Sequence, residues 1–259
     1  MTTDRFLRRS GLLSVAVFVY AVLLVPIVVI ILTSFTPRPF PTIPTRGISF
    51  EWYLALLENS QLIGALGVSL VIAAFTSVTS GTLGTITAFG FVRSDIPYKE
   101  TLSTLMLLPL MISPVITGLA LVRFAGQLRI GSGFVAVVLG HTVLTLPYVF
   151  LIVRAELVTF DRELESASRI LGAGPVESVF NITLPVISPA VISSMLIAFV
   201  VSFGEFTATQ FLVSSGTTTV PVIIYTMTRS GLNPQISALS TVLIGVMFVA
   251  ALVSGLVNR

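Results

Sequence analysis

Six long apolar segments limit this sequence to one class of fold. A helix needs about 20 apolar residues to cross the hydrocarbon core of a bilayer, and each segment supplies roughly that length. Strands of a membrane barrel would instead alternate in polarity over about ten residues, and these segments do not. The sequence therefore predicts an all-α, polytopic membrane protein with six transmembrane helices. The helices are expected at about residues 11–35, 62–92, 101–124, 132–154, 188–213 and 233–257.

Composition and charge exclude several other classes of protein. Of the 259 residues, 54% are hydrophobic and only 10% are charged, whereas about a quarter are charged in a soluble domain. The sequence contains no Cys, which excludes disulfides and thiolate chemistry. The net charge of +3 comes from arginines scattered at helix ends, where they act as topology signals. We therefore expect contact with membrane lipid and no nucleic-acid partner.

The distribution of Lys and Arg predicts how the chain is oriented. With the N-terminus inside, nine of these residues fall on the inner side and five on the outer side, which the positive-inside rule favours. Both termini should then be cytoplasmic. The inner set is Arg5, Arg8, Arg9, Arg93, Lys99, Arg154, Arg162, Arg169 and Arg259, and the outer set is Arg38, Arg46, Arg123, Arg129 and Arg229.

A polar inner loop at residues 155–187 separates the fourth and fifth predicted spans. Asp161 is a good N-cap for a short helix, and Gly172 is suited to follow the C-cap of that helix. Gly174 can then turn the chain, and Pro175 suits the first position of a second helix. The loop is therefore predicted to be a compact pair of short helices.

The same pattern predicts where the helix pair ends and which face is apolar. Leu184-Pro185 is expected to stop the second helix, and Pro189 to open the fifth span. In the first short helix, Leu164, Ala167 and Leu171 have the spacing of one apolar stripe. This stripe must be buried against either the chain's own helices or another protein, and the pattern alone leaves both open.

The stretch SASRILGAGPVESVFNITLP resembles the EAA loop of permease subunits of type I ABC importers. In that family the loop reads E-A-A, three residues, Gly, nine residues, Ile, one residue and Leu-Pro. Here Gly172 is followed by nine residues and then by Ile182, Thr183 and Leu184-Pro185. The first half departs from the pattern, because Ser166-Ala167-Ser168 replaces E-A-A and Glu165 lies one residue early.

The resemblance implies a type I ABC importer (MetI-like) permease bundle in a bacterial inner membrane, with the loop acting as a cytoplasmic coupling helix. Residues 1–61 would form an N-terminal transmembrane helix and a periplasmic loop, and residues 62–259 the transmembrane domain of the importer. The residues implied to couple the chain to its ATPase are Glu165, Ser166, Ala167, Leu171, Gly172, Ala173, Gly174, Ile182, Leu184 and Pro185.

The resemblance also implies three partners and no chemistry in this chain. The partners are a cytoplasmic ABC ATPase dimer, a second homologous permease subunit and a periplasmic substrate-binding protein. The phosphate-binding pattern GxxxxGK[ST] does not occur in the sequence, so ATP and magnesium would be used by the partner ATPase. We expect no bound cofactor, no catalytic residue and no enzyme activity in the chain itself.

Further segments resemble the smaller permease of the polyamine (spermidine/putrescine) branch of this family. A polyamine is therefore the first choice of substrate. Related importers for iron(III), opines or amino-acid-like solutes, phosphonate, thiamine or sulfate stay open, because the acid that polyamine relatives tend to carry after the Pro of LP-x-x-x-P is absent at Pro114-Val115. The segments are LPLMISPVITG, HTVLTLPYVF, ISPAVISSMLIAFVVSFGEFTATQFL and VPVIIYTMTRSGLNPQISALSTVLI.

Three residues are candidates for the translocation pathway. Glu205 lies in the fifth predicted span, where a carboxylate is costly and marks a pathway by default. It either faces the pathway, with Phe206 beside it, or forms a structural bond to a neighbouring helix. Arg123 either lines an outer gate or extends its guanidinium to the membrane interface. His141 is the only His, and we expect it to be a packing group and not a metal ligand.

Two other functional classes compete with an importer subunit. A secondary transporter would need intramembrane ion sites, often built on two broken helices in matching halves of the chain. A single intramembrane Glu is weak support for a secondary transporter. A membrane enzyme would need converging polar catalytic groups, and one His with no Cys does not supply them.

Overall fold

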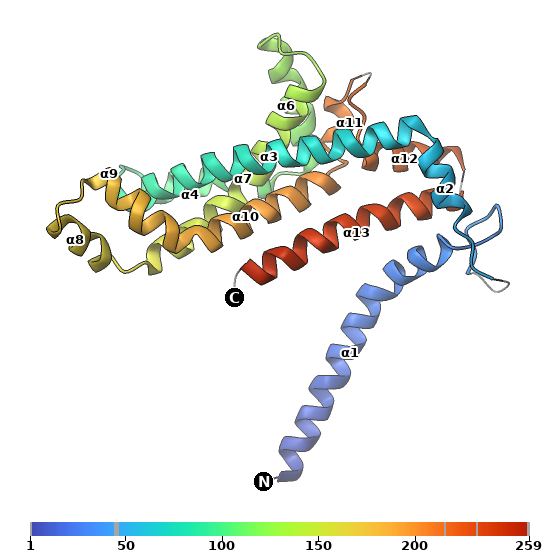
Figure 1. Ribbon diagram of the computed structural model, residues 1–259, viewed down its shortest axis with the longest axis horizontal. Helices are drawn as coiled ribbons and strands as arrows, with labels where there is room; N and C mark the ends of the chain where they lie inside the picture. The colour runs from blue at the N-terminus through green and yellow to red at the C-terminus, as the bar shows by residue number, and fades with distance from the viewer. Residues whose placement is uncertain (1, 44–46, 215, 232, 258–259) are drawn as a thin grey trace. The chain divides into compact units, whose positions relative to one another are not determined.

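The computed structural model describes residues 2–43, 47–214, 216–231 and 233–257, and these residues form helices and connecting segments without a strand (Figure 1). Arg46 and Arg259, two of the charges counted for orientation, lie outside the described residues.

The helices follow one another along the chain with short connections. In chain order they are α1 (Thr2–Thr33), α2 (Glu51–Glu58), α3 (Ser60–Arg93), α4 (Lys99–Met106), α5 (Leu108–Met111), α6 (Pro114–Gln127), α7 (Phe134–Thr159), α8 (Glu163–Ile170), α9 (Pro175–Ser178), the π-helical turn η1 (Val179–Thr183), α10 (Leu184–Gly204), α11 (Thr209–Leu212), α12 (Val220–Ser230) and α13 (Pro234–Val257).

Among the described residues, five helical segments are long and apolar enough to cross a membrane. They correspond to the first, second, fourth, fifth and sixth predicted spans, so the all-α membrane class is confirmed. The segments are Leu12–Thr33, Ser60–Arg93, Phe134–Thr159, Pro175–Gly204 and Pro234–Val257.

The third predicted span is not one helix, and here the sequence-based prediction was wrong. It consists of α4, α5 and α6, which are separated at Leu107 and at residues 112–113. Pro109 and Pro114 each lie at the start of a helix. A proline cannot donate a backbone hydrogen bond, and it disfavours helical geometry in the residue before it. Ser113 is accordingly extended, with φ −56° and ψ 133°.

Two further helices, α2 and α12, are absent from the sequence-based prediction. They contain 8 and 11 residues, respectively, so neither reaches the length of a membrane span. A search for apolar segments of spanning length does not detect helices of this size.

The chain forms two compact units, and the first comprises the chain through Ile63 together with Ile224–Ile244. Within this unit, the segment after α1 folds back on the end of that helix. Ser34 Oγ and Tyr53 OH are 2.6 Å apart, and Trp52 Nε1 donates to the Thr36 carbonyl at 2.8 Å. These bonds attach α2 to the end of α1.

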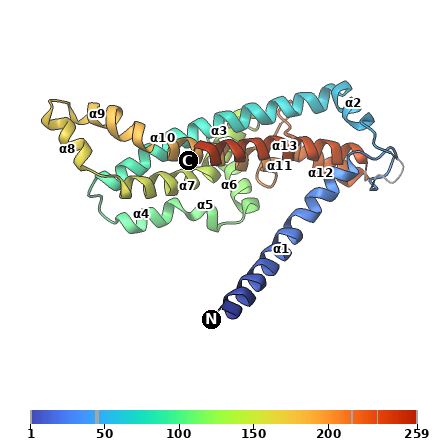
Figure 2. The same ribbon diagram turned by 60° about the horizontal axis from the view of Figure 1, so that its bottom comes forward.

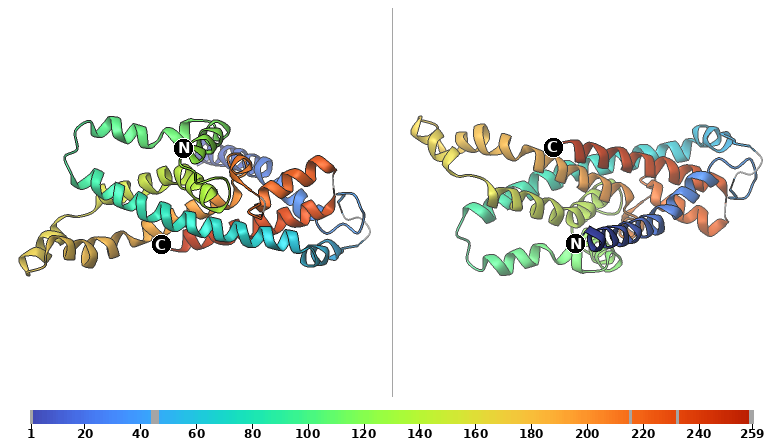
Figure 3. Two further views of the ribbon diagram at one scale, coloured as in Figure 1. Left: turned by 90° about the horizontal axis from the view of Figure 1, so that it is seen from above. Right: turned by 90° about the horizontal axis from the view of Figure 1, so that it is seen from below.

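The second unit comprises Gly64–Ile223 and Gly245–Arg259, and its core joins α3, α7 and α10. These three helices run side by side in Figure 2. The fully buried side chains Phe150 and Val153 of α7 pack with Phe91 of α3 and Ile187 of α10. The cluster lies toward the end of the unit where α3 and α7 end and α10 begins, which is the end that carries α8 (Figure 3).

Hydroxyl groups connect the same three helices deeper in the unit. Ser80 Oγ and Thr145 Oγ1 are 2.6 Å apart and buried. Ser77 Oγ donates to the Met195 carbonyl at 2.6 Å. In a bilayer, small polar residues of this kind hold helices together where apolar burial cannot, because lipid is as apolar as the protein core.

Gly84 is predicted to be required for the close approach of α3 to α7. A Cβ added there would lie 2.7 Å from Val149 Cβ and 3.3 Å from the Phe150 backbone nitrogen. Gly84→Ala should therefore overpack the interface at a cost of about 1–3 kcal/mol and lower the Tm of the detergent-solubilised protein. Gly90→Ala is the matched control, because its added Cβ would meet no atom within 4 Å. An equal loss in both variants would contradict this packing account.

Candidate functional site

The loop helix α8 begins and ends through backbone geometry that its sequence dictates. Asp161 Oδ1 accepts from the Glu163 backbone N–H at 2.9 Å, so Asp161 caps the helix although the N-cap position itself is Arg162. Gly172 follows the C-cap with φ +99°. Its N–H bonds the Arg169 carbonyl at 3.0 Å, and the next N–H bonds the carbonyl of Ser168 at 3.1 Å, which is a Schellman motif.

The second loop helix, α9, begins with Pro175 at its first position, as the sequence predicts. Gly174 precedes it in an extended conformation, with φ −69° and ψ 163°, and its N–H donates to Glu177 Oε2 at 3.3 Å. The Oγ atoms of Ser168 and Ser178 are 3.2 Å apart and join the two short helices. The predicted helix–turn–helix geometry is therefore present in the structure.

The prediction that Leu184-Pro185 stops the second helix was wrong. The helix continues through the turn η1 into α10 and is unbroken over Pro175–Gly204, so Pro189 lies inside a helix and does not open one. In the π-helical turn the Leu184 N–H reaches the Val179 carbonyl. This wider turn gives the ring of Pro185 room. The backbone N–H that Pro185 lacks falls near the start of α10.

The helix α8 buries an acidic side chain and leaves its apolar side chains exposed together with Glu163, Ser166 and Arg169. Glu165 is buried, whereas Leu164 and Ala167 of the predicted stripe are exposed. At the turn that follows, Ile170 and Leu171 are 86% and 88% exposed. An exposed apolar patch is typical of a surface that another molecule covers.

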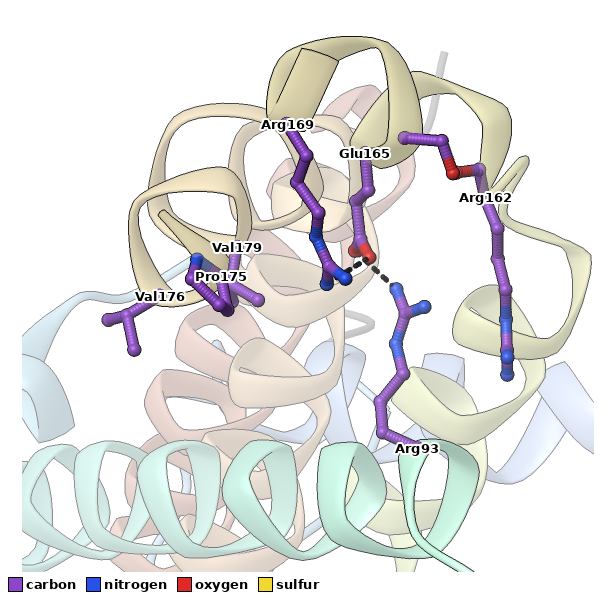
Figure 4. Close-up of a pocket in the computed structure, with 8 residues that line it drawn as sticks. Arg93, Arg162, Glu165, Arg169, Pro175, Val176 and Val179 are labelled. Carbon is purple, nitrogen blue, oxygen red and sulfur yellow. Dashed lines mark hydrogen bonds and ion pairs between the residues drawn. The ribbon is translucent and has the colours of Figure 1, made fainter. Parts of the chain in front are cut away.

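The buried carboxylate of Glu165 is held by side chains from two other segments, and Figure 4 shows its pair with Arg93. Arg93 Nη2 lies 2.5 Å from Glu165 Oε1, and Thr183 Oγ1 donates to the same oxygen. The guanidinium of Arg93 lies over the Phe160 ring, 5.7 Å from its centroid. We call these four residues the Arg93 junction. It joins the end of α3, the segment after α7, the helix α8 and the turn η1.

A hollow of about 520 Å³ opens beside the Arg93 junction. Arg169 and Arg162 lie at its edge, and Arg169 Nη2 is 3.9 Å from Glu165 Oε2. Arg162 Nη2 donates to the Val92 carbonyl at 3.3 Å. The hollow therefore combines two exposed cations with an apolar floor, which is formed by Pro175, Val176 and Val179.

The remaining residues predicted for the loop fall on both sides of it. Ser166 and Pro185 are exposed, whereas Ala173, Gly174, Ile182 and Leu184 are half-buried. Sequence reasoning missed Arg93 as a partner of Glu165 and counted it only as a topology charge. No spacing rule connects residues 72 positions apart in the chain, so only the folded structure reveals this pair.

The fifth span breaks at Glu205, the second position that the sequence singles out. α10 ends at Gly204, and Glu205 Oε1 accepts from the Ala208 N–H at 2.7 Å. The Glu205 carbonyl accepts from Thr209 Oγ1 at 2.8 Å. The carboxylate therefore caps the turn that interrupts the span, which sequence reasoning had drawn as one helix over 188–213. Phe206 lies half-buried in the same turn.

His141 supports this break from the neighbouring helix α7. Its Nδ1 is 2.7 Å from Ser202 Oγ, and its Nε2 is 2.7 Å from Thr209 Oγ1. The side chain is buried and both ring nitrogens are used, so it bridges the two sides of the break as a packing group. Arg123, the third pathway candidate, is exposed on α6, and no ion pair joins it to Glu205 among the described residues.

Comparisons with known proteins agree with this architecture. Residues 80–259 match the model of the family described as binding-protein-dependent transport system inner membrane component. The putrescine transport system permease protein PotI of Escherichia coli K12 is 33% identical over 244 residues, which cover 92% of this chain and 85% of PotI. The spermidine/putrescine transport system permease protein PotC of Haemophilus influenzae is 28% identical, with 99% and 98% covered.

Two solved structures have the same fold. A bacterial ABC transporter involved in the import of the acidic polysaccharide alginate gives a TM-score of 0.71 at 15% identity, covering 100% of this chain and 97% of that one. The inward-facing MetNI methionine ABC transporter gives 0.61 at 17% identity, covering 78% and 98%. The predicted MetI-like permease fold is therefore confirmed.

Glu205 is predicted to stabilise the break through its hydrogen bond and not through its charge. Glu205→Leu removes the acceptor of the buried Ala208 N–H, which should cost about 1–3 kcal/mol and lower the yield of folded protein. Glu205→Gln keeps a carbonyl oxygen at the same position, so its yield and Tm should stay close to those of the wild type. Losses as large in Glu205→Gln as in Glu205→Leu would contradict this role.

Proposed function

We propose, because this chain belongs to the family of binding-protein-dependent transport system inner membrane components, that it is the permease subunit of an ABC importer for polyamines. The chain is a transport subunit that sits in a bacterial inner membrane, and ATP is hydrolysed by a separate ATPase. The alternative of a secondary transporter has no comparable support.

The observation that carries the proposal is the exposed apolar patch on the loop helix α8 and the turn after it. The buried face of α8 holds a carboxylate, and its exposed face and turn carry Leu164, Ile170 and Leu171. The helix α9 adds Val176 and the turn η1 adds Phe180, which are 69% and 62% exposed, respectively. These side chains stand on a loop at the end of the helix bundle, where a protein partner is needed to remove them from water. A groove on the ATPase is that partner in our proposal.

The loop has the mechanical properties that a coupling element needs. The turn at Gly172 is held by the Schellman bonds, and Pro175 restricts the backbone that follows. From Pro175 the helix runs unbroken to Gly204 in the fifth span. When two ATPase subunits close on ATP, movement of the docked loop is therefore transmitted along one continuous helix into the membrane.

The complex that we propose contains an ATPase dimer, a second permease subunit that is homologous to this chain and a periplasmic substrate-binding protein. A relative with the same fold is described in complex with an alginate pentasaccharide-bound periplasmic protein, which supports a partner of this kind. With the loop on the cytoplasmic side, both termini are cytoplasmic, in agreement with the excess of inner Lys and Arg.

The polyamine assignment rests on relatives named for putrescine and spermidine transport. Selection among solutes falls mainly to the binding protein. The pathway through the permease needs only to accept what that protein delivers. Glu205, Phe206 and Arg123 stay candidates for that pathway, and one carboxylate oxygen of Glu205 is already used by the turn.

Gly172→Val is expected to uncouple ATP hydrolysis from uptake. A β-branched residue at φ +99° is strained, because non-glycine residues lose roughly 1–2 kcal/mol in left-handed geometry. The turn should reshape while the membrane helices persist. The measurement is putrescine uptake and ATP hydrolysis by the intact complex in proteoliposomes.

Gly126→Val is the matched control for this experiment. Gly126 lies within the helix α6, away from the coupling loop, and an added Cβ meets no atom within 4 Å. This variant should transport normally. Normal putrescine uptake by Gly172→Val would contradict the coupling role of the loop, and a wild-type complex without ATP-driven uptake would contradict the proposed function itself.

A further inference from the structure

We propose that Arg93 is a positioning residue of the transport cycle. Its ion pair with Glu165 locks the coupling loop to the end of α3, so that α3 moves together with α10 when the loop is displaced. This inference rests on the proposed function, since it describes how motion supplied by the ATPase is distributed within the permease.

The Arg93 junction brings four segments together, and Figure 4 shows the Arg93–Glu165 pair at its centre. Arg93 lies in the last turn of α3, and its Nη2 is 2.5 Å from Glu165 Oε1. The same oxygen accepts from Thr183 Oγ1 of η1. Phe160, which follows α7, lies 5.7 Å below the Arg93 guanidinium. The loop is thereby tied to α3 and α10 at a single point.

The burial of the pair shows what it can contribute. The side chains of Arg93 and Glu165 are only 22% and 7% exposed. Desolvation offsets much of the attraction in a buried ion pair, so such a pair adds little net stability compared with apolar packing. Short charge-assisted bonds are nevertheless directional. The pair therefore specifies one register of α8 against α3, which apolar side chains would not specify.

The other contacts of α8 explain why this link matters. α8 packs on its chain neighbours α9 and η1, both of which lead directly into α10. These contacts alone would pass a displacement of the loop to the fifth span. The Arg93–Glu165 pair, with the longer bond from Arg162 to the Val92 carbonyl, adds the second span to the moving body.

The departure from the family motif fits the same role. Ser166 stands where the motif has its Glu, and it is exposed and bonds the Arg162 carbonyl at 3.2 Å. Glu165, one residue earlier, points inward to Arg93. The acid nearest to the motif position therefore serves the permease's own helices and is not available to the ATPase.

The test measures the number of ATP molecules hydrolysed per putrescine imported by the intact complex in proteoliposomes. Arg93→Met and Glu165→Met should each raise this ratio about fivefold or more, the lower end of typical coupling effects. Each single variant also leaves one charge buried without its partner. The double variant Arg93→Met with Glu165→Met leaves no unpaired buried charge, so its yield and Tm should return toward those of the wild type. Its ratio of ATP hydrolysed to putrescine imported should stay raised.

Lys99→Met is the matched control, since it removes one cation from the same side of the chain without touching the Arg93 junction. Its ratio should equal that of the wild type. A double variant with a wild-type ratio would overturn the proposal, because the single variants would then have failed only through an unpaired charge. Loss of copurified ATPase with an unchanged ratio would also overturn it and make the pair a docking contact.

Milder variants keep the test decisive if the Met variants do not yield protein. Arg93→Lys keeps the charge on a shorter reach, and Glu165→Gln keeps a hydrogen-bond acceptor without the charge. Both should raise the ratio to a smaller extent, and wild-type ratios in both would overturn the proposal. A wild-type complex that lacks ATP-driven uptake would instead contradict the proposed function. This outcome differs from any that contradicts only the role of Arg93.

Discussion

A bilayer offers no water to backbone N–H and C=O groups, so every interruption of a helix must be satisfied by the protein itself. The long helices α3, α7, α10 and α13 follow from this constraint. The interruption after α10 follows it as well, because Glu205 accepts the Ala208 N–H and His141 bonds both flanking hydroxyls. A carboxylate that looks like a pathway group in the sequence thus has a structural task first.

Outside the bilayer, water can hydrogen-bond to exposed polar groups, and exposing apolar side chains to that water is unfavourable. The loop of α8 and α9 buries its acid and exposes Ile170 and Leu171. An exposed apolar face of this kind marks an interaction site, and in our proposal a partner covers it in the complex. The Arg93 junction attaches the inner side of the loop to the bundle. In the proposed complex, the outer side of the loop contacts the ATPase.

The class of fold, most of the spans and the loop turn at Gly172 could be predicted from sequence, because each depends on local pattern or on one residue's backbone freedom. The breaks at Ser113 and Glu205 and the continuation through Pro185 could not, since a proline or a polar residue in an apolar segment is compatible with either a kink or a break. The Arg93–Glu165 pair was also beyond reach, because it joins segments that only folding brings together.

The most direct test of the central claim is a photoreactive amino acid placed at Leu171 in the intact complex, followed by identification of the crosslinked partner. The control is the exposed position Ile48, which the proposed orientation places on the periplasmic side of the membrane. The account predicts that the ATPase is crosslinked from Leu171 and not from Ile48. A crosslink from Leu171 that forms only within its own chain, or to a periplasmic protein, would contradict it.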